Sequence, residues 1–182
     1  MEKGAEVPLK DLIPVFHHWI QKDKLEGMLI DVTEYTHVHQ GPGLLLIANE
    51  ANYSLDEMDG KRGFLYNQKR VPEKSNEEHL RTAFRRILGA CLLLEKEPEV
   101  AGKIKFAANH LQVFVNNRLA APHHSQSNEE LEKSLKPLLE ELYGDAKTLL
   151  IPERDPLKRT GLEIKVEKSV DLETLLKKLN KN

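Results

Sequence analysis

Two histidines stand two residues apart in the segment EYTHVHQGPG, residues 34–43, directly before a Gly-Pro-Gly turn. If this segment is extended, His37 and His39 project from the same side of a strand, about 6–7 Å apart. Two imidazoles at that distance can share a metal ion, which then needs at least one more ligand. The chain offers several candidates whose spacing does not select among them: His17, Asp31, Glu34, Glu50, His123 and His124.

The same pattern has a structural interpretation, which we favour. Both histidines can face solvent or bond to loop carbonyls beside a tight turn. Pro42 fixes φ, and the glycines on either side permit a sharp corner that leads into a buried strand. Pro42 also removes a backbone donor, so the segment is not a phosphate-binding loop. The chain contains no HExxH, CxxC or calcium-loop motif, so no cofactor is predicted and a metal remains open.

If the protein binds a small molecule, we expect the ligand at this corner. His17 lies at the border of the apolar face of a predicted helix, and the polar loop 48–63 can bring further groups over a cleft. Imidazoles, carboxylates and phenols bind metals or move protons near neutral pH. The predicted ligand-binding residues are therefore His17, His37, His39, Glu50 and Tyr53.

A basic segment provides a competing location, which would prefer an anion. Residues 61–86 carry 8 basic and 3 acidic side chains, whereas residues 1–60 carry 4 basic and 11 acidic ones. Arg70 and Arg85 lie in the basic segment. Arg118 follows a predicted strand, where it can bind a carboxylate or phosphate or tie down loop carbonyls. Few aromatic side chains accompany these arginines, so we do not expect nucleic-acid binding.

The elements that must position these residues can be read from hydrophobic periodicity. Four segments show the i, i+3, i+4 pattern of amphipathic helices: 8–22, 75–97, 127–143 and 170–179. Seven apolar runs between them are typical of strands: 27–32, 43–48, 63–68, 103–108, 111–116, 147–152 and 161–167. This order is a helix and a strand followed by three ββα-like units. It predicts an α+β fold, with a largely antiparallel sheet and amphipathic helices on one face.

Composition favours a single α+β domain of residues 1–182. The chain is 40% hydrophobic and 31% charged, which is enough apolar material for a sizeable core. Its single cysteine, Cys91, excludes an intrachain disulfide and lies on the apolar stripe of the predicted helix 75–97. We expect Phe84, Leu88 and Cys91 to be buried on that helix, while Arg81 and Arg85 stay in water.

The location and partners can be predicted only in general terms. No apolar run approaches the roughly 20 residues of a membrane helix, and no secretory signal opens the chain, so we expect a soluble cytoplasmic protein without a membrane partner. Seven strands without a barrel pattern leave sheet edges or an apolar face to cover. A homodimer is the commonest solution, and we expect self-association.

Three segments resemble the fixed points of an uncharacterised bacterial protein family: VFHHWI (15–20), DVTEYTHVHQGPG (31–43) and NNRLAAP (116–122). The resemblance spans most of the chain and implies no activity, ligand or catalytic residue. We therefore interpret the protein as a binding or assembly module of unknown function. The alternative is a metal-dependent or acid/base enzyme, hydrolase-like, with a site built from His17, His37, His39 and Glu50.

Overall fold

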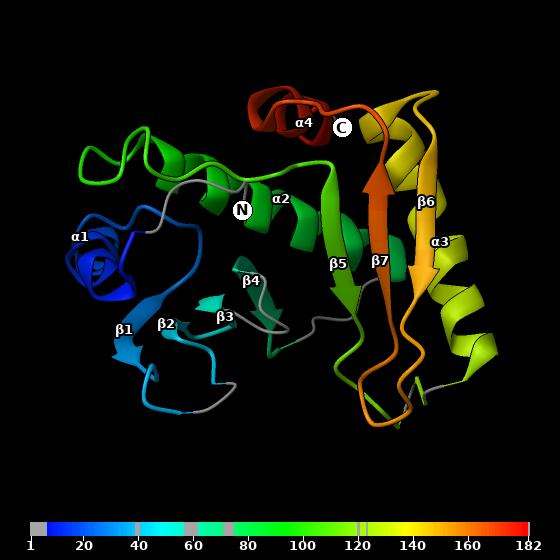
Figure 1. Ribbon diagram of the computed structural model, residues 1–182, viewed down its shortest axis with the longest axis horizontal. Coiled ribbons are helices and arrows are strands. Elements are labelled where there is room, and N and C mark those ends of the chain that lie inside the picture. Colours follow the sequence, from blue (N-terminus) through cyan, green and yellow to red (C-terminus); the bar gives the residue numbers. More distant parts are fainter. Residues whose placement is uncertain are drawn as a thin grey trace. The chain divides into compact units, whose positions relative to one another are not determined.

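The computed structural model describes residues 7–38, 41–56, 62–70, 75–119, 121–122 and 124–181 (Figure 1). In these residues, helices accompany two antiparallel sheets, one of four strands and one of three. The α+β fold class predicted from the sequence is therefore confirmed. The chain divides into two compact units, Met1–Ser75 with Thr82–Phe106 and Asn76–Arg81 with Ala107–Asn182. The single domain of residues 1–182 stays a prediction.

The first unit is built on the four-stranded sheet, in which each strand pairs antiparallel with the next in the order β1-β2-β3-β4. Its elements are the 3₁₀ helix η1 (Leu9–Leu12), α1 (Ile13–Gln21), β1 (Leu29–Glu34), β2 (Leu44–Ala48), β3 (Ala51–Asp56), β4 (Gly63–Gln68) and most of α2 (Asn76–Lys96). Pro14 lies in the first turn of α1, where its missing N–H breaks no helical hydrogen bond.

One face of this sheet forms the core of the first unit. Alternate residues of β2 and β3 are buried: Leu44, Leu46, Ala48, Ala51, Tyr53 and Leu55. Aromatic rings extend the core, because Phe64 of β4 stacks on Phe16 of α1 with centroids 6.1 Å apart and on Phe106 with centroids 6.0 Å apart. The alternate residues of β2 and β3 and the apolar stripe of α1 therefore pack into the same apolar cluster.

A buried hydrogen bond joins α1 to the chain beyond α2. The indole Nε1 of Trp19 donates to Oε1 of Glu97 at 2.7 Å, and both side chains are buried. Burying a carboxylate without a hydrogen-bond donor costs free energy. The indole N–H of Trp19 provides this donor for Glu97. The sequence indicated neither partner.

The second unit is built on the three-stranded sheet, in the order β5-β7-β6. Its elements beyond the first turns of α2 are β5 (His110–Phe114), α3 (Ser125–Tyr143), β6 (Thr148–Pro152), β7 (Gly161–Val166) and α4 (Leu172–Leu179). Helix α3 packs against β6 and β7 with a buried leucine stripe: Leu131, Leu135, Leu138, Leu139 and Leu142. Tyr143 at its end donates its hydroxyl proton to the carbonyl of Ala108 at 2.5 Å.

The ends of α3 and α4 follow from local capping. Asp171 accepts a hydrogen bond from the Thr174 N–H at 2.8 Å and caps α4. Gly144, with φ of +62°, ends α3 in a conformation that glycine adopts without strain. The predicted start of this helix at residue 127 is wrong. Helix α3 begins two residues earlier, because Nδ1 of His124 accepts the Ser127 N–H at 3.2 Å.

Two strand assignments made from the sequence are wrong. The run 103–108 forms no strand, although Ile104, Phe106 and Ala108 are buried in the alternating pattern of one. The backbone N–H of Phe106 instead donates to the Glu95 carboxylate at 2.7 Å, which replaces a ladder hydrogen bond. The predicted loop 48–63 contains a strand, β3, that places Tyr53 in the core.

These two differences change the predicted order of elements. Within the described part of the chain, four strands precede α2, one strand precedes α3, and only β6, β7 and α4 keep the expected ββα order. The strands also form two antiparallel sheets instead of one. The antiparallel pairing was predicted correctly, whereas the three ββα-like units were not.

The buried stripe of α2 is confirmed. Phe84, Leu88 and Cys91 are all buried, and burial raises the pKa of the Cys91 thiol, which stays protonated and inert near neutral pH. Arg81 and Arg85 are half-exposed and ion-paired, so neither is simply in water. Both Nη atoms of the Arg81 guanidinium group donate to the carboxylate of Glu141 on α3.

Replacing Phe84 by alanine tests the packing of α2. The buried ring leaves a cavity when it is removed, so we expect Phe84→Ala to lower the free energy of unfolding by about 3–5 kcal/mol in chemical denaturation. Gln21→Ala, on the exposed end of α1, is the control and should change it by less than about 0.5 kcal/mol. A loss below about 1 kcal/mol for Phe84→Ala would contradict the observed orientation of the helix.

Candidate functional site

The corner after β1 does not have the extended geometry that the histidine spacing required. Strand β1 ends at Glu34, and the chain then turns: the Val38 N–H donates to the Tyr35 carbonyl at 2.9 Å. The Tyr35 N–H donates across to the carbonyl of Gly43 at 2.6 Å. His37 is therefore exposed in a turn, with its ring stacked 6.4 Å from that of Tyr35. His39 lies outside the described residues.

The Gly-Pro-Gly corner is structural, as the sequence indicated. Gly43 has φ of +62° and starts the turn into β2. A Cβ atom at this position would collide with the carbonyl oxygen of Leu55 on β3. Only glycine allows the two backbones to approach this closely.

The strand register separates Glu50 from His37. Leu44 at the start of β2 pairs with Glu34, whereas Ala48 at its end pairs with Leu29. Glu50 follows Ala48, so it lies beyond the end of β2 opposite to His37, and a strand of this length separates the two by about 13 Å. His17 is exposed on α1.

Tyr53 lies inside the core and not at a surface corner. On β3 it pairs with Tyr66 of β4, and the two rings are 5.1 Å apart. Burial raises the pKa of Tyr53 to about 12 and also raises the pKa of Tyr66, while the positive charge of Arg86 acts in the opposite direction on both phenols. Both phenols are neutral donors near neutral pH.

Among the described residues, no group of three or more His, Cys, Asp or Glu side chains is arranged to hold a metal ion. His39 and His123, which were two of the candidates, lie outside that part of the chain. The described residues therefore give the metal-dependent alternative no ligand set.

The three predicted anion-binding arginines each have a different partner. Arg70 follows β4, and its backbone N–H donates to the Glu50 carbonyl at 3.2 Å. Arg85 of α2 pairs with Glu26 at 3.3 Å, and its neighbour Arg86 pairs with the same carboxylate. Arg118 belongs to the second unit and donates to the carbonyl of Leu157 at 2.9 Å, which is the loop-tying role that the sequence left open.

Sequence reasoning missed the role of Glu26 and Arg86. These residues are 60 positions apart, and no periodicity connects a loop after α1 with the fourth turn of α2. The available signal was the adjacency of Arg86 to Arg85 in a segment of net positive charge. Without the fold, that signal did not show whether the two arginine side chains are solvated or form ion pairs.

The outer strand of the first sheet presents apolar side chains to solvent. Within the described residues, β1 pairs on one side only, with β2 (Figure 1). Met28 is 68% exposed and Ile30 is 54% exposed, and Ile30 lies at an irregularity in the pairing of β1 with β2. Tyr35 and Val38, just beyond the strand, are also exposed. An exposed apolar edge is a typical docking surface.

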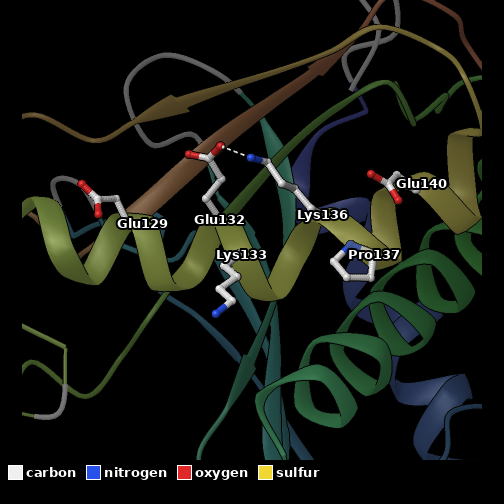
Figure 2. A pocket seen from close by; sticks show the side chains of 6 residues that line it. All are labelled: Glu129, Glu132, Lys133, Lys136, Pro137 and Glu140. Atoms are coloured by element: carbon white, nitrogen blue, oxygen red, sulfur yellow. Dashed lines mark ion pairs between the residues drawn. The ribbon is translucent and has the colours of Figure 1, made fainter.

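A shallow hollow on α3 carries no site. Figure 2 shows that its lining comes from one helix and that the side chains point in different directions along the solvent side: Glu129, Glu132, Lys133, Lys136, Pro137 and Glu140. Lys136 pairs with Glu132 at 2.9 Å, one turn away. Charges of both signs alternate without converging on a point, as on an ordinary solvated helix face.

Comparison of the chain with known protein families, with curated proteins and with solved structures finds no match. The resemblance to a bacterial family therefore stays a prediction. None of the helices in the described residues combines the length and the apolar character that crossing a membrane requires.

The buried phenol of Tyr53 should make the folded protein less stable at alkaline pH. Because its pKa is about 12 in the folded protein and about 10 in the unfolded chain, the neutral form is favoured by folding. This contribution is complete below about pH 10 and is lost as the pH rises toward 12. Wild type should therefore lose about 1.4 kcal/mol more than Tyr53→Phe between about pH 8 and pH 11.

Denaturant unfolding at the two pH values measures this difference. The exposed Tyr35 provides the control, and Tyr35→Phe should show the same pH dependence as wild type. Equal pH dependence of wild type and Tyr53→Phe would mean that Tyr53 ionises as easily in the folded protein as in the unfolded chain.

Proposed function

We propose that the protein is a binding module and that strand β1 is its docking surface for an extended segment of another protein. The observation that carries this proposal is the exposure of Ile30 on β1, and of Met28 directly before it, because β1 pairs on one side only within the described residues. A partner segment that adds a strand there would bury both side chains and complete the backbone pairing.

The backbone of β1 supports this geometry. Tyr35 donates toward β2, and in an antiparallel ladder alternate residues point the same way, so Val32 and Glu34 direct their backbone groups outward. The outward N–H of Val32 is held by the Asp31 carboxylate at 2.8 Å. An incoming strand therefore pairs first at Glu34 and then displaces Asp31 from Val32.

The charges on β1 select the chemistry of the partner. Asp31 and Glu34 are exposed acids beside the exposed apolar side chains. A second copy docked through the same edge would place these carboxylates against their equivalents, which is unfavourable across a strand pair. Asp31 and Glu34 point to opposite faces of the strand, so a segment with alternating apolar and basic side chains would place its basic face against one of the two acids. No contact among the described residues favours the enzyme alternative over this proposal.

Two synthetic octapeptides with alternating sequences, one of Val and Lys and one of Val and Glu, test the docking surface. We expect the lysine peptide to bind at least about tenfold more tightly at low salt and to slow amide hydrogen exchange at Val32 and Glu34. Ile30→Lys should abolish binding, whereas the matched variant Leu149→Lys, on an exposed leucine of β6 in the second unit, should not.

Equal binding of the two peptides would contradict the proposed role of Asp31 and Glu34. Failure of both peptides to protect the β1 amides, even at millimolar concentration, would remove β1 as a docking surface.

Self-association is proposed through a different edge. The acidic β1 disfavours a symmetric contact, whereas β6 is an outer strand of the second sheet and carries Leu149, which is 55% exposed. Sedimentation at micromolar concentration should show a species of twice the monomer mass of 20.8 kDa. Leu149→Lys should return it to the monomer mass, while Ile30→Lys should not. A dimer dissolved by Ile30→Lys instead would identify a second copy as the occupant of β1.

A further inference from the structure

Two neighbouring arginines of α2 hold one carboxylate between them. Oε1 of Glu26 lies 2.9 Å from Nη2 of Arg86, and Oε2 lies 3.3 Å from Nη2 of Arg85. Nη1 of Arg86 also donates to the backbone carbonyl of Glu26. A carboxylate shared by two guanidinium groups has the arrangement in which arginines recognise carboxylates and phosphates.

The inner side of this cluster has an unused donor. The side chain of Arg86 is only 14% exposed, and its Nε–H is buried without a hydrogen-bond partner in the described residues. Buried donors in folded proteins are almost always satisfied, so an unpaired one at the base of a charged cluster points to a missing acceptor. Glu26 reaches the Nη atoms of Arg86 and leaves Nε unpaired.

Two phenols add donors beside Arg86. The positive charge of Arg86 acts on both Tyr53 and Tyr66, and a side-chain hydrogen bond also joins Arg86 to Tyr53. Because burial raises the pKa of both phenols, they are protonated near neutral pH and can donate to an anion. Glu26 and Glu50 are the acidic groups that also act on Tyr66, and both would oppose an added anion.

The position of Glu26 allows its carboxylate to move away from the two arginines. Its side chain is 61% exposed, in contrast to the buried guanidinium that it contacts. It stands in a short loop between Asp23 and Gly27, both of which have positive φ values. Because the Glu26 carboxylate is exposed, it can rotate into water while Arg86 still holds the backbone carbonyl.

We propose that Arg85 and Arg86 form an oxyanion-binding site and that Glu26 is its internal occupant, which the carboxylate or phosphate group of a ligand replaces. The site is independent of docking at β1. The contrast with Arg81 supports it: Arg81 lies one turn earlier on α2, makes a two-pronged contact with Glu141, and has no buried unpaired nitrogen.

Inorganic phosphate and acetate, each titrated at constant ionic strength and pH against chloride, are the probes. The arginine Nε–H signals in ¹⁵N NMR spectra report binding directly. We expect saturable shifts of the Arg86 Nε–H in wild type and an affinity about three- to tenfold higher in Glu26→Gln, because the internal competitor no longer occupies the site. Arg85→Gln and Arg86→Lys should each weaken binding at least about tenfold, since both remove part of the paired fork.

Arg81→Gln is the matched control, because it removes one positive charge and one ion pair from the same helix and should leave the affinity unchanged. The absence of saturable shifts in both wild type and Glu26→Gln would overturn the site. Equal affinity of wild type and Glu26→Gln would overturn the role of Glu26 as occupant. A loss in Arg81→Gln as large as that in Arg85→Gln would show that only net charge matters and would overturn the site as well. Preference for phosphate over acetate, or the reverse, identifies which oxyanion the ligand carries.

Discussion

The hydrogen bond between Trp19 and Glu97 is the constraint on which the first unit depends. A carboxylate buried in an apolar core needs a donor, and leaving it unpaired would cost about 1–3 kcal/mol or more. The indole N–H is that donor, so α1 and the chain after α2 must meet at one fixed point. Around it the rings of Phe16, Phe64 and Phe106 stack in sequence. The hydrogen bond fixes where α1 meets the chain after α2, and the aromatic rings supply most of the buried apolar area.

The sequence predicts the helices well because their signals are local. Apolar spacing, capping residues and glycine act within a few positions, and they place the four helices with errors of a few residues at their ends. The run 103–108 shows the limit of this reasoning. Its buried residues alternate as in a strand, yet the partner of the Phe106 N–H is the side chain of Glu95 and not a neighbouring strand. Strand β3 shows the converse, since its polar residues hid the buried alternation of Ala51, Tyr53 and Leu55.

The candidate sites were harder to predict, because they depend on which way the chain turns and on contacts between distant residues. A shared metal at His37 and His39 required an extended backbone, but the hydrogen bond from Val38 to Tyr35 turns the backbone at His37. Glu50 and Tyr53 were assigned to the same corner, whereas the strand register sends one to the opposite end of β2 and the other into the core. Arg85 was a candidate in the anion-binding alternative, but its partner Glu26 could be found only from the fold.

The burial of Cys91 has a practical consequence for labelling the protein. The chain has no other cysteine, and this thiol is enclosed in the core and held in its protonated form. A cysteine introduced on the surface would therefore react selectively with a maleimide dye or a nitroxide, with the native thiol left in place. Distances between dyes attached to the two compact units would then report how those units are arranged in solution.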